Sequence, residues 1–190
     1  TPLVELEKNA VTSCFSEDGR FLAAQWTNGT VEVWDLSRRI LLRRLTDAAG
    51  MVRTAGPKAS GLVQFLPGGQ KLITWSGRDN LLHEWNLFSG AEEQTWQAPL
   101  AFDSVAVSPD GRQCIALGWE GDFVLRNLKD KSQRTPELNL LEGDLGCFSP
   151  DGKLFAAASS LGYAQVWDAA TWQPLATLGG FLKGAHTLAF

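Results

Sequence analysis

The sequence predicts an all-β fold in which one four-stranded antiparallel sheet recurs about four times along the 190 residues. Short apolar runs of about five residues alternate with turn-forming residues, which is the pattern of β-strands. No segment keeps the helical period of an amphipathic helix. Two sequence markers also recur in step with each other, which indicates an internal repeat.

The first marker is a tight turn between two apolar runs, and the second is a bulky side chain that closes a later strand. Glycines end the four turns at intervals of 50, 42 and 41 residues: Gly19, Gly69, Gly111 and Gly152. The second marker recurs at intervals of 51, 41 and 41 residues: Trp34, Trp85, Arg126 and Trp167. Because two independent markers keep the same spacing, the repeat is about 42 residues long.

The last complete unit shows its four strands most clearly, near 145–149, 153–158, 163–168 and 174–178. Pro at the second position and Gly at the fourth position of its first turn predict a type I turn. In the first unit, Asn28-Gly29 between two apolar runs predicts a hairpin with a type I′ turn. This hairpin accounts for the Asn-Gly-Thr sequence without glycosylation.

The residues now carry a family resemblance. Trp34-Asp35, Trp167-Asp168 and the Ser-Pro-Asp-Gly turns at 108–111 and 149–152 resemble the WD-repeat β-propeller family, in its bacterial form. The second and third units depart from the pattern, because they end in Trp-Asn and Arg-Asn. The resemblance implies a propeller of four-stranded antiparallel blades, about four of them complete, with a strand at each end, held mainly by packing.

The expected boundaries of the blades follow from the markers. Complete units are expected at about 10–46, 61–97, 103–142 and 145–179, with partial blades at 1–9 and 180–190. Propellers close 4 to 8 blades into a ring, and an open arc leaves two apolar blade faces uncovered. We therefore expect residues 1–190 to form part of a larger propeller, either with further blades beyond this sequence or through self-association of two copies.

Composition excludes several function classes. The net charge of −4 lacks the basic field that nucleic-acid binding requires, so no nucleic-acid partner is expected. No apolar run approaches the length of a membrane helix, so no membrane partner is expected either. The three cysteines, Cys14, Cys114 and Cys147, are too far apart in sequence to form a zinc motif and are expected to be buried free thiols. Free thiols and the absence of a signal-peptide pattern favour a cytoplasmic location.

Catalytic candidates are few, and no cofactor is predicted. His83 has Glu84 beside it on a predicted strand, so the two side chains point to opposite faces and do not act as a pair. His186 stands where the resemblance implies a structural histidine. We expect no enzyme but a non-catalytic protein–protein interaction scaffold, which the resemblance extends to a regulatory module of a larger signalling protein. The alternative is a hydrolase or lyase that uses the central channel.

Other proteins are the expected partners, bound through loops on one face of the propeller and through its rim. The segment 46–60 adds about eight residues to the connection between the first two units, and such a loop is either functional or merely tolerated. The candidate partner-binding residues are Arg53, Lys58, Arg78, Trp119 and Glu120.

Two further groups have both a structural and a functional interpretation. The pairs Arg38-Arg39 and Arg43-Arg44 either protect the edge of a sheet or contact an acidic or phosphate-bearing partner. The tryptophans at the second marker are expected in the core. Those near the ends of second strands are either rim anchors for a partner or buried under a neighbouring blade: Trp26, Trp75 and Trp119.

Overall fold

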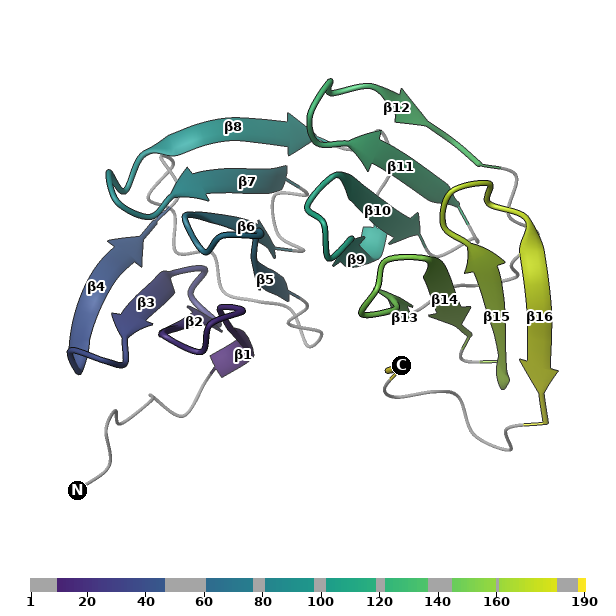
Figure 1. Ribbon diagram of the computed structural model, residues 1–190, viewed down its shortest axis with the longest axis horizontal. Coiled ribbons are helices and arrows are strands. Elements are labelled where there is room, and N and C mark those ends of the chain that lie inside the picture. Colours follow the sequence, from purple (N-terminus) through teal and green to yellow (C-terminus); the bar gives the residue numbers. More distant parts are fainter. Residues whose placement is uncertain are drawn as a thin grey trace. The chain divides into compact units, whose positions relative to one another are not determined.

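The computed structural model describes residues 10–46, 61–76, 81–97, 102–118, 122–136, 145–159, 161–180 and 188–190. The chain divides into two compact units, Thr1–Gln97 and Ala98–Phe190, each of which holds two four-stranded sheets. The strands of each sheet follow one another in chain order, so every sheet is an antiparallel meander (Figure 1). The all-β prediction is confirmed.

The first unit holds blades 1 and 2. Blade 1 consists of β1 (Ala10–Phe15), β2 (Phe21–Trp26), β3 (Val31–Asp35) and β4 (Ile40–Leu45). Blade 2 consists of β5 (Gly61–Phe65), β6 (Lys71–Ser76), β7 (Leu81–Asn86) and β8 (Glu92–Gln97). The first strands of the two blades, β1 and β5, lie against each other.

The second unit holds blades 3 and 4. Blade 3 consists of β9 (Phe102–Val107), β10 (Gln113–Gly118), β11 (Phe123–Asn127) and the short β12 (Gln133–Arg134). Blade 4 consists of β13 (Leu145–Phe148), β14 (Leu154–Ala158), β15 (Tyr163–Asp168) and β16 (Pro174–Gly179), which confirms the four strands predicted for the last unit. The strand β13 lies against β9. The predicted partial blades 1–9 and 180–190 lie outside the described residues, apart from Gly180 and 188–190.

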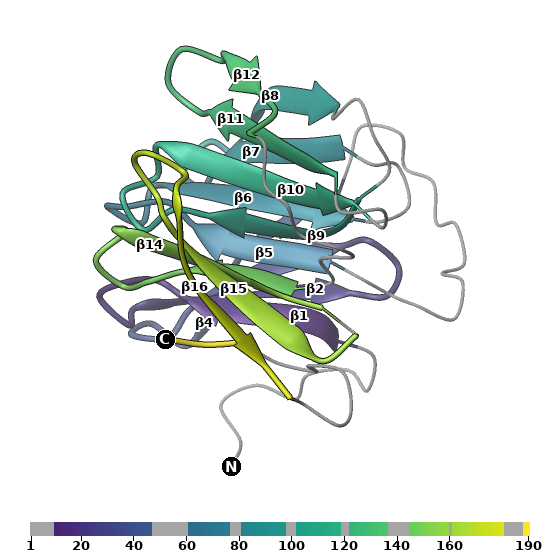
Figure 2. The ribbon, with the colours of Figure 1, turned by 90° about the vertical axis from the view of Figure 1, so that its right-hand side faces the viewer.

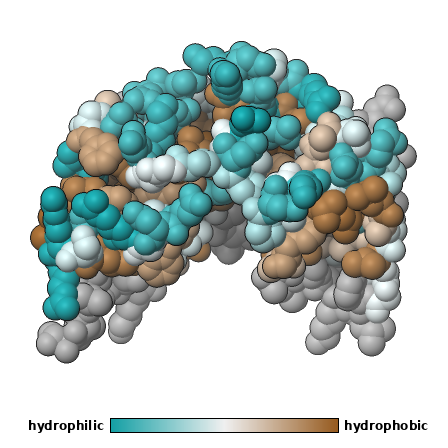
Figure 3. All heavy atoms as spheres, viewed as in Figure 1, coloured by the Kyte–Doolittle hydropathy of each residue, from teal (hydrophilic) through white to brown (hydrophobic). Residues whose placement is uncertain are grey.

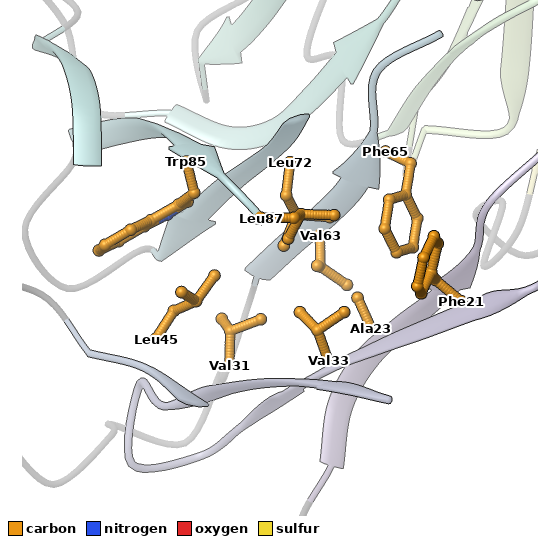
Figure 4. Packing of buried hydrophobic residues seen from close by; sticks show 10 residues of the cluster. All are labelled: Phe21, Ala23, Val31, Val33, Leu45, Val63, Phe65, Leu72, Trp85 and Leu87. Atoms are coloured by element: carbon orange, nitrogen blue, oxygen red, sulfur yellow. The ribbon is translucent and has the colours of Figure 1, made fainter. Parts of the chain in front are cut away.

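Each unit has a hydrophobic core between its two blades. In the first unit the core joins side chains of blades 1 and 2, with Phe21 stacked on Phe65 at 6.4 Å between ring centroids (Figure 4). In the second unit it joins Ile115, Leu117 and Phe123 of blade 3 to Phe155 and Trp167 of blade 4. Alternate residues of each strand point to one face, so a blade offers one face to each neighbour.

The turn between the first two strands has the same hydrogen bonds in blades 1, 3 and 4. In blade 4, Ser149 Oγ donates to Asp151 Oδ1 at 2.7 Å and accepts from the Leu154 amide at 2.9 Å. Ser16 with Asp18 and Ser108 with Asp110 repeat this arrangement. Blade 2 has neither side chain, and its Gly68 has a φ of +82°, so Pro67-Gly68 fits a type II turn. The type I prediction therefore does not extend to this blade.

The hairpin at Asn28-Gly29 is not the predicted type I′ turn. Of these two residues only Gly29 has a positive φ, +85°, whereas a type I′ turn needs two. The Trp26 amide donates to the Thr30 carbonyl at 2.8 Å, so the loop has three residues and not two. Such loops combine a type I turn with a left-handed glycine, and Asn28 Oδ1 supports it by accepting the Thr30 amide at 2.9 Å.

The residue after the second marker caps the turn between the third and fourth strands. The side-chain oxygen Oδ1 accepts backbone amides two and three residues ahead, as Asn127 does from Lys129 at 2.8 Å and from Asp130 at 3.2 Å. Asn86 and Asp168 make the same pair of contacts. Because Asn supplies this oxygen as well as Asp, the second and third units keep the turn without the Trp-Asp pair.

The same turn ends in a left-handed residue in all four blades, and only one of these is glycine: Arg39, Gly90, Lys131 and Trp172. We expect Lys131→Gly to raise the free energy of unfolding by about 0.5–1 kcal/mol, because relief of left-handed strain exceeds the entropy cost of glycine. Chemical denaturation measures the change. The matched control is Lys129→Gly in the same turn, where φ is not positive, and an equal gain there would contradict the argument.

Candidate functional site

The strand ends that flank the predicted partner-binding residues lie on the same side of each sheet, where the strands end and not along an outermost strand. This side is here called the loop edge. In the first unit Leu45 pairs with Val31, and Gly61 with Ser76, so segments 46–60 and 77–80 both leave from this edge. In the second unit 119–121 connects β10 to β11 at the corresponding end. Figure 2 shows the strands of each blade side by side, with their ends at two opposite edges.

The five predicted residues, Arg53, Lys58, Arg78, Trp119 and Glu120, fall on segments outside the described residues. Only the positions of the neighbouring strand ends therefore indicate at which side of the sheets these five residues lie. They stay a prediction.

The described part of the loop edge is a packed structure in the first unit. Trp26 and Trp75 are buried, so their interpretation as exposed rim anchors is wrong, while Trp119 lies outside the described residues. Gln25 Nε2 donates to the Trp75 carbonyl at 3.1 Å and links blade 1 to blade 2. The sequence did not predict this hydrogen bond, because no sequence motif identifies a buried glutamine in a strand.

The opposite edge, where the first and third turns of each blade lie, is called the turn edge. Here the carboxylate of Asp35 is buried in blade 1 and accepts from Ser37 Oγ at 2.6 Å, Arg20 Nη2 at 2.9 Å and the Arg38 amide at 3.0 Å. The hydrogen bond from Ser37 and the Arg20 guanidinium hold the pKa of Asp35 well below its ordinary value. Asp35 is thus a structural anion.

Asp35 should make stability depend on pH. Its pKa is lower in the folded chain than the value near 3.9 of the unfolded chain, so its stabilisation is present above about pH 4 and is lost as pH falls below it. We expect Asp35→Asn to lower Tm at pH 7, with a gap to the wild type that narrows toward pH 2. Asn keeps the turn cap, as at Asn86 and Asn127. Calorimetry at pH 2, 3, 4, 5 and 7 measures the gap, and a constant gap would contradict this role.

Three of the four paired arginines, Arg43 and Arg44 on β4 and Arg38 in the turn before it, contact oxygens of the protein itself. Arg44 Nη2 lies 2.6 Å from Glu32 Oε1, and Arg38 lies 3.9 Å from Asp35. Arg43 donates to the carbonyl of Phe88, in the β7–β8 turn of blade 2, so it joins the two blades. Since β4 is the outermost strand of its sheet, these contacts favour the structural interpretation over a phosphate site.

The described histidine and the cysteines have structural surroundings. His83 is buried, stacks on Trp85 at 5.8 Å between ring centroids, and has Nδ1 2.7 Å from Glu92 Oε1. Burial raises the pKa of Cys14 to about 11 and of Cys114 to about 12, so neither is a thiolate nucleophile at neutral pH. His186 lies outside the described residues.

The first strand of each described blade carries few titratable side chains. Across β1, β5, β9 and β13 the sequence holds one carboxylate, Asp103, and no histidine. In the part of the chain that the structure describes, no three His, Cys, Asp or Glu side chains gather in a way that could hold a metal ion. The same residues contain no helix long and apolar enough to span a membrane.

Comparisons with known proteins agree with the repeat and the fold. The family model "WD domain, G-beta repeat" matches residues 1–35 and 144–168. The chain is 27% identical over 157 residues to the serine-threonine kinase receptor-associated protein of Gallus gallus, covering 80% of this chain and 40% of that protein. It is 25% identical over 173 residues to the target of rapamycin complex subunit LST8 of Mus musculus, covering 85% and 50%.

A solved structure has the same fold. The β-propeller domain of Cps50 (Swd1) from Myceliophteria thermophila superimposes with a TM-score of 0.78 at 16% identity, over 96% of this chain and 59% of that one. The chain thus spans about half the length of the curated relatives that it matches. Repeat spacing, four-stranded sheets and these matches together show the β-propeller fold and a similarity to WD-repeat proteins.

Proposed function

We propose that the chain is a non-catalytic scaffold that binds other proteins at the loop edge of its blades. The observation that carries the proposal is the composition of the first strands of the four described blades, β1, β5, β9 and β13, whose sequences hold one carboxylate and no histidine and therefore offer no general acid–base pair. His83 and Asp35 are buried and paired, and Cys114 is buried, whereas Cys14 and Cys147 are half-buried free thiols, so the prediction of three buried thiols holds only for Cys114. This supports a binding role over the hydrolase or lyase alternative.

The names of the relatives support protein partners. One relative is named as associated with a kinase receptor and another as the subunit of a complex. A role as the regulatory module of a larger signalling protein is in keeping with both names. Rigid sheets that carry connecting segments at one edge suit this role, because loops on a fixed scaffold commonly supply binding residues.

The chemistry of the predicted residues points to a partner with an acidic and apolar surface. Arg53, Lys58 and Arg78 contribute three positive charges against one negative charge from Glu120, and Trp119 adds an aromatic side chain. Tryptophan and arginine are enriched among the residues that dominate interface energies. The 46–60 segment carries two of the five residues.

A displayed library of random peptides tests the proposal with a defined probe. Selected peptides are expected to be acidic with apolar anchors, and Arg53→Glu with Arg78→Glu is expected to raise their Kd at least about tenfold. The matched control reverses two exposed cations on the turn edge, Arg112→Glu with Lys153→Glu. Equal weakening by the two pairs, or no effect of the first pair, would refute a site at the loop edge.

A further inference from the structure

The loop between β2 and β3 in blade 1 carries a dipeptide whose chemistry the proposed binding role does not use. Asn28 is exposed in this three-residue loop and is followed by Gly29. The other five asparagines of the sequence are each followed by alanine or leucine. Because glycine has no side chain, its amide nitrogen can be approached closely by the carboxamide of the residue before it. Asn28 is therefore the asparagine whose side chain has the least hindered access to the following amide.

The two residues contain both reactants of a deamidation, which needs only water. The Gly29 amide nitrogen attacks Cγ of Asn28, so that a C–N bond forms and the Cγ–Nδ2 bond breaks. The proton of the amide nitrogen goes to the leaving nitrogen, which departs as ammonia and leaves a cyclic imide. Water then opens this ring at either carbonyl, adding a hydroxyl group to the carbon and a proton to the nitrogen. The products are aspartate or isoaspartate, whose main chain runs through the former side-chain carbon.

In the folded hairpin hydrogen bonds hold both reacting groups. The Gly29 amide donates to the Trp26 carbonyl at 2.9 Å, so the attacking nitrogen keeps its proton on that oxygen. Asn28 Oδ1 accepts the Thr30 amide at 2.9 Å, which fixes the carboxamide toward the residue beyond the glycine. Attack requires the nitrogen to lose its proton and the carboxamide to turn onto it. Both hydrogen bonds must therefore break before the ring can close.

These bonds can break without the unfolding of blade 1. Residues 27–30 are exposed or half-buried. The strands that they connect are fixed by Gln25, which pairs with Val31, and by Ala24, all of which are buried. Exposed loops open at a lower free-energy cost than the buried strands beside them. Ring closure at Asn28 thus depends on the opening of the loop alone.

From this geometry we infer that Asn28 is a site of spontaneous deamidation and that opening of the β2–β3 loop sets its rate. Conversion to aspartate adds a negative charge at the loop edge, where β3 begins. Conversion to isoaspartate lengthens the main chain of a loop that the hydrogen bond from Trp26 to Thr30 closes at three residues. The modified loop no longer fits this closure, so the product accumulates as a permanent record of opening. The inference does not depend on the proposed binding of a partner.

Peptide mapping by mass spectrometry during incubation at neutral pH tests the inference. Asn28 is expected to convert at least about tenfold more slowly in the folded chain than in the same chain unfolded by guanidinium chloride, because two hydrogen bonds oppose opening. Asn86 and Asn127, each followed by leucine, are the internal controls and are expected to stay intact in both samples. Figure 3 shows mainly hydrophilic side chains over the turns of blade 2, so water also reaches the first of these controls. Asn28→Gln is expected to abolish conversion at position 28, because glutamine would have to close a larger ring.

Two further measurements separate opening of the loop from unfolding of the blade. Hydrogen exchange of the Gly29 amide reports the same opening, so its protection factor is expected to agree within about threefold with the slowing of deamidation. Phe65→Leu weakens the core of the first unit at the turn edge, where Phe65 stacks on Phe21. This variant is expected to change the rate at Asn28 in the folded chain by less than about twofold, because the loop opens without the core.

Each contrary result overturns one part of the inference. An Asn28 that stays intact in the unfolded chain, or that converts no faster there than Asn86 and Asn127, would refute the site. Equal rates in the folded and unfolded chain, or an unprotected Gly29 amide, would refute control by the loop. A rate that rises with Phe65→Leu in proportion to its loss of stability would show that the reaction requires unfolding of the whole unit.

Discussion

Trp167→Ala is expected to lower the free energy of unfolding by about 3–5 kcal/mol, the range for truncation of a buried aromatic side chain. Trp167 is 1% exposed and lies between blades 3 and 4. Its ring is 6.4 Å from that of Phe123 in blade 3 and 6.0 Å from that of Phe155 in blade 4, measured between centroids. The substitution removes contacts on both sides and leaves a cavity that the rigid strands cannot close.

Denaturant titration followed by circular dichroism measures this loss. The control is Leu161→Ala, at an exposed position in the β14–β15 turn of the same blade, where the expected change is within about 0.5 kcal/mol. A loss below about 1 kcal/mol for Trp167→Ala would show that the two blades of the second unit do not share one core. A loss of the expected size would be a large share of the stability of a typical domain.

The repeat markers made the blades predictable because each marker has a local structural cause. The turn glycines are needed for left-handed φ angles, and the bulky marker supplies the side chain that faces the preceding blade, as at Trp85 and Trp167. Because successive side chains of a strand point to opposite faces, the strand positions then indicate which residues are buried. Such local causes can be recognised in a single sequence.

Features that depend on neighbouring sheets could not be predicted in the same way. Whether Trp26 and Trp75 are exposed or buried depends on packing from other segments, so both outcomes were open. The Asn28-Gly29 turn was predicted one residue too short, because the pairing of Trp26 with Thr30 decides the loop length. The same limit holds for the partner-binding residues, which lie outside the described residues.

A last consequence of the repeat is that small residues on one blade match large residues on its neighbour. Gly146 in β13 stands where blade 2 has Val63, and Leu117 of blade 3 stands where blade 1 has Gln25. A Cβ atom at Gly146 would lie 2.5 Å from Leu117 Cδ1 and 2.7 Å from Phe155 Cζ. The glycine is therefore required by the leucine opposite and not by its own backbone conformation.

Gly146→Val is accordingly expected to lower the free energy of unfolding by about 2–3 kcal/mol, because overpacking of a core displaces side chains and backbone, whereas valine favours a strand by less than that. The control is Gly179→Val in β16, where a Cβ atom would meet nothing within 4 Å and the expected change is within about 0.5 kcal/mol. In a double-mutant cycle with Leu117→Ala, the two losses should add to more than the loss of the double variant, because removing the leucine makes room for the valine. If the losses in the free energy of unfolding were strictly additive, Gly146 and Leu117 would not interact, which would refute the size matching between blades 3 and 4.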